Sequence, residues 1–341
     1  MKSFQRLCIA FAVLFASAVA FCSCNKADSQ SPGWVQDLAV SPIGYRDSVP
    51  SKHQYAKPLF RLSCHYPAQP GSGNDKFRSE ALNGRVLSAK NAWKYMDALK
   101  QEIKPLLQPF FTDSANWAAE DNGWFHESWL GTRREPLLGA YLEEEPASPT
   151  GRIQAWTGFR YVLTLYDSTA AFALGKSQNA VGYAPRQTDF AEGSTVVKLI
   201  FSPVNDPVRE VMHGAATFLV YDTLQTLDQP EKGYRLRTVS FFRMDIAVKD
   251  SKAAPGLGWV YASFVYDTGA TGSLWDKLVP LAMVWNKDPE ALSPLQPPFP
   301  SRKEKVVNTA APVYAHELLY APHLDTDLPF FPVMTWPFGV E

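Results

Sequence analysis

The chain has 341 residues, of which 46% are hydrophobic and 20% charged, so it can build one large domain or two smaller ones and is not mainly disordered. Its formal net charge of −1 argues against a nucleic-acid binder and against a polybasic membrane-surface protein, since both need concentrated positive charge. Aromatic residues reach 13% beside 27 prolines, a mixture that favours short strands and ordered loops over a helical bundle.

Residues 1–23 have the pattern of a bacterial lipoprotein signal peptide. A short basic region precedes the apolar stretch 7–21, which is too short to be a comfortable membrane-spanning helix. The following Phe21-Cys22-Ser23-Cys24 resembles the box at which lipoprotein leaders are cut, and Cys24 would then become the lipidated first residue. Cleavage after Ala20 is the alternative and would release a soluble protein. We expect a lipoprotein anchored in the bacterial cell envelope, facing the periplasm or the cell surface.

This processing determines the expected state of each of the four cysteines. Cys8 and Cys22 would leave with the leader, and Cys24 would carry the lipid. Cys64 would then be the single thiol of the folded part, so we expect no intramolecular disulfide.

The first part of the mature chain changes character near residue 76. Residues 24–75 are rich in Ser, Pro, Gly and Asp and are expected to form a tether and an N-terminal extension. Residues 77–107 have a helical pattern, with Ser88 as the expected helix cap and Pro105 and Pro109 ending the helix.

From residue 152 the apolar period changes to two, which indicates strands. The expected strands cover residues 159–166, 194–201, 215–221, 234–248 and 258–266. Alternation in the longest of them predicts an antiparallel sheet with one buried and one wet face. We therefore expect an α+β domain over residues 76–289, predominantly an antiparallel β-sheet with N-terminal helices. Residues 290–341 are a Pro- and aromatic-rich C-terminal extension that must cover its own sheet or a partner.

The densest polar and aromatic cluster lies between residues 121 and 135. Here His126, Glu127 and Arg134 are weak candidates for an acid–base pair or a sugar-stacking site. Adjacent residues on a strand point to opposite faces, so His126 and Glu127 need not cooperate. The alternative is a packed loop in which arginine and glutamate pair and tryptophan fills the core.

Other polar residues carry weaker signals. The six histidines lack metal-ligand spacing, so we expect no metal site. No CxxCH occurs, which excludes covalent c-type haem, and we expect no cofactor. Glu143–Glu145 is expected to be a solvated turn. Lys176 and Lys198 are expected to be solvent-facing amines.

Three segments resemble the cytochrome P-460 domain family. They are Ala170–Lys176, Ala191–Lys198, and Asp245–Asp250 followed by Gly258-Trp259. Secreted bacterial proteins are also similar over the region from Gly258 onward. The resemblance implies a small, mostly antiparallel sheet with helices, and Lys176 and Lys198 match its pattern. Haem-bearing members attach haem through a C-terminal CxxCH, whereas no cysteine follows Cys64 here, so hydroxylamine oxidation and gas binding do not carry over.

Three functions follow as hypotheses. The first is a non-enzymatic, haem-less envelope lipoprotein that uses a P-460-like sheet as a binding or structural module. Its partners would be the membrane, through the lipid anchor, and a protein or small-molecule ligand, but no nucleic acid. The second is an enzyme with a site around His126, Glu127 and Arg134. The third is a noncovalent haem binder with a histidine ligand.

Overall fold

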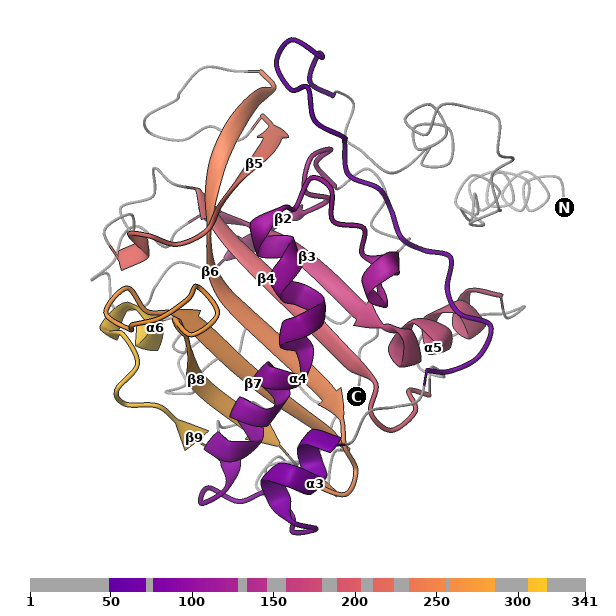
Figure 1. Ribbon diagram of the computed structural model, residues 1–341, viewed down its shortest axis with the longest axis vertical. Helices are drawn as coiled ribbons and strands as arrows, with labels where there is room; N and C mark the ends of the chain where they lie inside the picture. The colour runs from indigo at the N-terminus through magenta and orange to yellow at the C-terminus, as the bar shows by residue number, and fades with distance from the viewer. Residues whose placement is uncertain are drawn as a thin grey trace, which may run out of the picture.

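The computed structural model describes nine stretches of the chain. They are residues 49–71, 76–127, 134–145, 158–179, 189–203, 211–223, 233–255, 258–285 and 306–317. The expected leader, Cys24 and the aromatic tail beyond residue 317 lie outside these stretches. Within them, a broad antiparallel sheet is crossed on one face by a long helix (Figure 1).

The sheet contains nine strands within the described stretches, in the order β1-β3-β4-β6-β7-β8-β9, with β2 also paired to β3 and β5 to β6. The strands are β1 (Trp124–Phe125), β2 (Tyr141–Glu145), β3 (Gly158–Asp167), β4 (Thr195–Pro203), β5 (Thr217–Asp222), β6 (Arg235–Lys249), β7 (Trp259–Tyr266), β8 (Leu278–Trp285) and β9 (Val306–Val307). All pairs are antiparallel. The expected antiparallel, β-rich α+β architecture is therefore confirmed, and five strands lie where the period of two predicted them.

Four α-helices accompany this sheet in the described part: α3 (Lys76–Leu82), α4 (Ala92–Thr112), α5 (Ser168–Asn179) and α6 (Val313–Glu317). The prediction that Pro105 and Pro109 end the long helix is wrong, because both lie inside α4. Leu107 and Phe110, in the last turns of α4, are buried, and their packing offsets the backbone hydrogen bonds that the prolines cannot make. Ser88 is not the cap, since α4 begins after Asn91.

The main core lies between helices α3 and α4 and one face of the sheet. Val197, Leu199 and Phe201 of β4 point into it, together with Tyr95 and Leu99 of α4. Aromatic contacts join the end of α4 to the strands, and the rings of Phe110 and Phe218 stack with 5.2 Å between their centroids.

The opposite face of the sheet is buried as well, so the expected wet face is wrong. Two smaller apolar clusters occupy its ends: one includes Tyr314 of α6, and the other includes Leu174 of α5. Between them lie charged residues of β6 that the alternation assigned to solvent, including Arg243 at 0% and Asp245 at 2% exposure. The alternation along the strand therefore assigned residues to the correct face of the sheet, but it did not reveal that the polar face is also buried.

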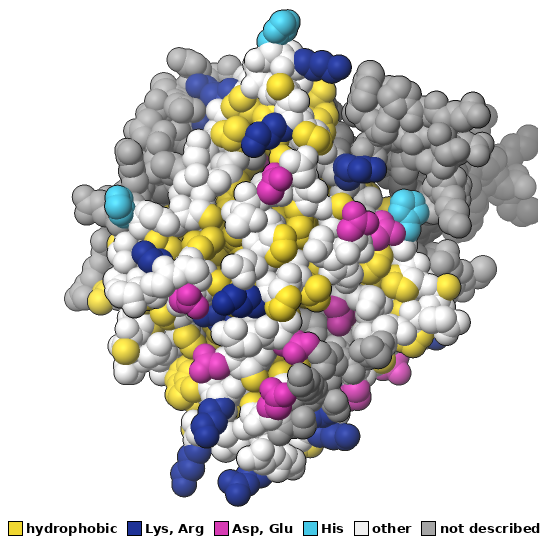
Figure 2. All heavy atoms as spheres, viewed as in Figure 1, with side chains coloured by type: hydrophobic (Ala, Val, Ile, Leu, Met, Phe, Trp, Pro, Cys, Tyr) yellow, Lys and Arg dark blue, Asp and Glu magenta, His cyan; other side chains and the backbone are white. Residues whose placement is uncertain are grey.

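Parts of both expected extensions belong to this domain. Ser63 and Cys64 of the N-terminal extension are buried, and the segment 49–71 (indigo in Figure 1) runs along the β3 side of the fold to α5. At the other end, β9 pairs with β8, and α6 packs on the second face. Figure 2 shows acidic and basic side chains both spread over the helical face, in keeping with the small net charge.

Candidate functional site

A pocket of about 130 Å³ lies at the C-terminal end of α4, on the helical face of the sheet. Its walls come from segments that are far apart in the sequence: residues 58–61, the end of α4 with the following residues 114–119, the turn at 137–138, and β3. The apolar part of the lining consists mainly of Leu59, Phe60, Phe110, Leu137, Leu138 and Leu163. His126, directly after β1, supplies a buried polar side chain to the same lining, which also contains the polar residues Arg61, Ser114, Asn116 and Trp117.

The imidazole of His126 is held in one orientation by the N-terminal extension. The backbone N–H of Ser63 donates to Nδ1 over 3.1 Å, and the backbone N–H of His126 donates to the Ser63 carbonyl over 2.8 Å. The Tyr66 hydroxyl donates to the His126 carbonyl over 2.7 Å. The ring of Phe60 contacts the imidazole edge to face, with 4.8 Å between centroids. These contacts fix both the backbone and the ring of His126.

The protonation state of His126 follows from these contacts. Burial and the nearby Arg134 guanidinium hold the pKa of His126 well below its usual 6.5, so the ring is neutral at pH 7. A neutral imidazole carries one proton, and Nδ1 accepts a hydrogen bond, so the proton is on Nε2. Nε2 has no hydrogen-bond partner in the part of the chain that the structure describes.

Arg134 shapes the pocket wall rather than the pocket interior. Its Nη1 donates to the Gly139 carbonyl over 2.6 Å and its Nη2 to the Glu127 carbonyl over 2.7 Å. The guanidinium also lies 5.6 Å from the centre of the Phe60 ring. Gly139 has a φ of +73°, and a Cβ there would lie 2.2 Å from the Phe60 ring, so glycine is required both by the turn and by this close approach.

Glu135 builds the turn that carries two of the apolar wall residues. Its buried carboxylate accepts the backbone N–H groups of Leu137, Leu138 and Ala140 at 2.9, 2.6 and 3.3 Å, and that of Tyr221 at 3.2 Å. Burial raises the pKa of Glu135 to about 7, against the opposing effect of these hydrogen bonds. Glu135 therefore acts as a structural centre of the wall.

The three candidate residues do not converge in one pocket. His126 lines the pocket on the helical face, whereas Glu127 and Arg134 do not belong to its lining. The Glu127 carboxylate lies 3.5 Å from Arg134 and interacts electrostatically with Tyr141, Tyr166 and Lys198 of the other face. The physical reason is the alternation of side chains along an extended segment. A His126–Glu127 acid–base pair is therefore not formed, and the Arg134–Glu127 pair fits the packed-loop alternative.

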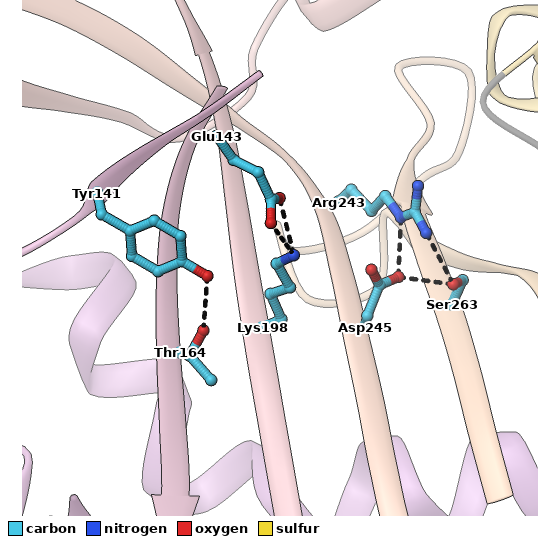
Figure 3. Close-up of polar contacts among 7 residues, drawn as sticks. All are labelled: Tyr141, Glu143, Thr164, Lys198, Arg243, Asp245 and Ser263. Atoms are coloured by element: carbon cyan, nitrogen blue, oxygen red, sulfur yellow. Dashed lines mark hydrogen bonds and ion pairs between the residues drawn. The ribbon is translucent and has the colours of Figure 1, made fainter. Parts of the chain in front are cut away.

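A polar row crosses the middle of the second face (Figure 3). We use this name for Thr164, Lys198, Asp245 and Ser263, which lie opposite one another on β3, β4, β6 and β7. Lys198 Nζ binds the Glu143 carboxylate at 2.8 and 2.9 Å. Asp245 accepts from Arg243 at 2.8 Å and from Ser263 at 2.6 Å. The Tyr141 and Thr164 hydroxyls are 3.4 Å apart.

The polar row corrects two expectations. Lys198 is 5% exposed rather than solvent-facing, and Glu143 lies in β2 rather than in a solvated turn. Each supplies the other's counter-ion, which neither local sequence pattern revealed. Lys176, in contrast, is exposed on α5, with its Nζ 5.5 Å from the centre of the Phe172 ring. The two lysines that match the family pattern therefore do not share a site.

Cys64 is disulfide-bonded, so the expectation that it has no intramolecular partner is wrong for this chain. The other three cysteines, at positions 8, 22 and 24, lie outside the described residues. The expectation failed because it assumed that the leader had been removed and Cys24 lipidated, whereas the full-length chain keeps all three sulfur atoms.

Two features are absent from the described stretches. No cluster of three or more His, Cys, Asp or Glu side chains there is arranged to hold a metal ion. No helix there combines the length and apolar character needed to cross a bilayer.

Comparison of this chain with protein-family models, with curated proteins and with solved structures found no match. The site therefore has to be interpreted from its own geometry. Of its main residues, sequence reasoning found His126 and Arg134 but missed Phe60, Ser63 and Glu135. Phe60 and Ser63 lie in what looked like a tether, and no local signal marks them as parts of a wall.

Proposed function

We propose that the protein is an envelope lipoprotein whose antiparallel sheet domain binds a small molecule in the His126 pocket, as a binding module and not as an enzyme. One observation carries this proposal. A neutral, buried imidazole is held rigidly at the wall of a pocket in which apolar side chains lie beside the polar residues Arg61, Ser114 and Asn116, and its Nε2–H is unused by the described part of the protein. A concave site that combines apolar walls with a few fixed polar groups is the common form of a small-molecule site.

The geometry does not favour the enzyme hypothesis. General acid–base catalysis needs a group whose pKa lies near the working pH and which reaches the reacting atom. The pKa of His126 is lowered away from that range, and Glu127 lies on the other side of the sheet. Within the described residues, the pocket therefore offers a hydrogen bond rather than a proton relay.

A noncovalent haem does not fit this pocket. Drug-sized ligands occupy pockets of roughly 300–1,000 Å³, whereas this one measures about 130 Å³. A histidine that binds iron through Nε2 needs its lone pair there and a proton on Nδ1, but Nδ1 already accepts the Ser63 N–H. His126 in its present tautomer is therefore a donor and not an axial ligand.

Membership of a cytochrome P-460-like, haem-less family remains part of the proposal. It is supported by the antiparallel sheet and by the fact that two of its motifs occupy strands that pair with each other, since Lys198 of β4 lies opposite Asp245 of β6. The proposed partners are the membrane and a small-molecule ligand.

Benzene tests whether the pocket accepts a ligand. An apolar protein cavity of about 150 Å³ binds benzene, so we expect saturable binding here with a dissociation constant of about 0.1–1 mM. Chemical-shift changes in labelled protein would report it. Ala115 lines the pocket, so Ala115→Trp is expected to abolish binding, while the matched variant Ala310→Trp, at an exposed position in the β9–α6 turn, keeps it. Equal binding by both variants, or none by the wild type, would overturn the proposal.

The anchor is tested by fractionation. Cys24→Ala is expected to move the protein from the membrane to the soluble fraction, because the acyl chains on Cys24 supply the attachment. Cys22→Ala is the control and is expected to stay in the membrane, because Cys22 would leave with the leader.

The disulfide of Cys64 provides a second test. Once residues 1–23 are removed and Cys24 is lipidated, no other cysteine is left to form a disulfide with Cys64. A mature chain with Cys64 linked to Cys22 or Cys24, found by non-reducing peptide mass mapping, would therefore contradict the lipoprotein proposal, as would unchanged membrane association of Cys24→Ala.

A further inference from the structure

The lining of the His126 pocket changes from apolar to polar between its buried and its exposed part. Except for His126, the buried residues of the lining are all apolar: Phe110, Ala119, Leu137, Leu138 and Leu163. The other polar residues lie in the exposed or half-buried part, which we call the mouth. Arg61 and Asn116 are exposed there, and Ser114 and Trp117 are half-buried. A ligand that fills the pocket therefore meets apolar side chains at one end and hydrogen-bonding groups at the other.

The charge of the mouth is positive. Among the described residues that line the pocket, Arg61 is the only one with a charged side chain at pH 7. A guanidinium has five N–H donors in a planar fork, so it can bind a carboxylate while it keeps other partners. Asp113 is outside the lining, and its exposed carboxylate accepts from Asn116 Nδ2 over 2.9 Å. The lining itself therefore favours an anion over a cation.

Trp117 adds a donor whose hydrogen bond is not made within the described residues. Its indole Nε1 is buried and has no partner there. The indole packs edge to face on Phe110, with 5.2 Å between ring centroids, which fixes it between the apolar end and the mouth. A buried donor without an acceptor costs free energy, and a ligand oxygen that enters this wall can recover that cost. The Ser114 hydroxyl is a further donor beside it.

The volume of the pocket limits the apolar part of the ligand. The pocket measures about 130 Å³, close to the roughly 150 Å³ of an apolar protein cavity that holds benzene. The buried end, between Phe110 and Leu163, therefore has room for about one ring or a short branched chain. A charged group is excluded from this end by the cost of desolvation, so it belongs at the mouth.

We infer that the His126 pocket binds a small amphipathic monocarboxylate, with an apolar body of about one ring at the buried end and the carboxylate at the mouth beside Arg61. This inference rests on the proposed function and specifies its ligand class. It assigns Arg61 and Trp117 to recognition of the acid, and Phe110 and Leu163 to the apolar body.

Three probes of similar shape test the charge of the ligand: benzoate, uncharged benzamide and the cation benzylammonium. Each is titrated into the wild-type protein at low ionic strength, in competition with benzene. We expect benzoate to bind about fivefold more tightly than benzamide, the effect of one contact with an exposed guanidinium, and benzylammonium to bind most weakly. High salt should remove the difference between benzoate and benzamide, because exposed charges are screened. The Nε1–H resonance of Trp117, assigned by its loss in Trp117→Phe, should shift when benzoate binds.

Two arginine variants locate the charge that is recognised. Arg61→Gln is expected to lower the affinity for benzoate to that for benzamide. Arg85→Gln is the matched control, because Arg85 is an exposed arginine after α3 and outside the lining, and it should keep the preference for benzoate.

The outcomes separate this inference from the function on which it rests. Benzene binding without a preference for benzoate, a preference that survives Arg61→Gln, or a Trp117 resonance that stays in place would each overturn the ligand class and leave the binding module intact. Absence of binding by every compound, benzene included, would overturn both. The comparison of the three probes uses the wild-type protein, so a variant that fails to fold does not affect it.

Discussion

Asp250→Ala is expected to lower the free energy of unfolding by about 3–5 kcal/mol, as removal of one partner of a buried ion pair does. Asp250 is 2% exposed and lies directly after β6. Its carboxylate accepts from Arg78 of α3 at 2.9 Å, from the Tyr95 hydroxyl of α4 at 2.7 Å, and from the backbone N–H of Ala253 at 2.9 Å. One side chain thus joins two helices to the turn between β6 and β7.

The Tyr95 hydroxyl adds a second cost to the Asp250→Ala substitution. Burial and the Asp250 carboxylate raise the pKa of Tyr95 well above 10, so the hydroxyl is protonated and donates at every pH at which the protein would be studied. Alanine at position 250 leaves this donor buried without its acceptor, which adds the desolvation cost of an unmet hydroxyl to the lost ion pair.

Urea denaturation followed by circular dichroism measures the effect. Asp250→Asn keeps an acceptor oxygen of the same shape and is expected to fall between the wild type and the alanine variant. Asp121→Ala, at an exposed position, is the matched control and should change stability by less than about 0.5 kcal/mol. A loss below about 1 kcal/mol for Asp250→Ala would show that the helices are held to the sheet by apolar packing alone.

This role of Asp250 also explains part of the motif in which it was noticed. Asp245–Asp250 and Gly258-Trp259 looked like a family signature, and in the fold they are the two sides of a hairpin: the Asp250 N–H donates to the Gly258 carbonyl over 2.9 Å. Gly258 has a φ of +76°, which favours glycine there. Both residues are accounted for by folding, without a ligand.

The sequence predicted most reliably what depends on local periodicity. Strands β3, β4, β5, β6 and β7 have apolar residues at every second position and were found, whereas β1 and β9 have two residues each and show no period. The full length of α4 depends on tertiary packing of Leu107 and Phe110, which overrides the local effect of two prolines.

The candidate site was less predictable because it is assembled from distant segments. His126 attracted attention through its aromatic neighbours, but its tautomer is set by Ser63, a residue 63 positions away. Likewise, Lys198 and Glu143 each looked solvated and are partners across 55 positions. Pairings of this kind come from strand register, which one sequence without its fold does not supply.

The ion pair of Arg243 and Asp245 is expected to show the largest difference between single and double substitutions. Both side chains are buried, at 0% and 2% exposure, and Arg243 Nε donates to Asp245 over 2.8 Å while Ser263 donates to the same oxygen over 2.6 Å. Asp245→Val removes the counter-ion and leaves a buried guanidinium, for which we expect a loss of about 3–5 kcal/mol.

The double variant Arg243→Met with Asp245→Val removes both charges and fills the space with apolar atoms. We expect its free energy of unfolding to return to within about 1 kcal/mol of the wild type or to exceed it, because desolvation of a buried pair cancels much of its attraction. Arg243→Met alone should be intermediate, since it leaves Asp245 with Ser263 as a donor.

Urea denaturation of the wild type, the two single variants and the double variant gives the coupling energy between the two positions. A double variant that remains as unstable as Asp245→Val would contradict this account and would mean that the polar row holds the second face through its geometry rather than through charge balance. Benzene binding by the double variant separates the two faces: the pocket at His126 lies on the opposite side of the sheet, so its affinity should be unchanged.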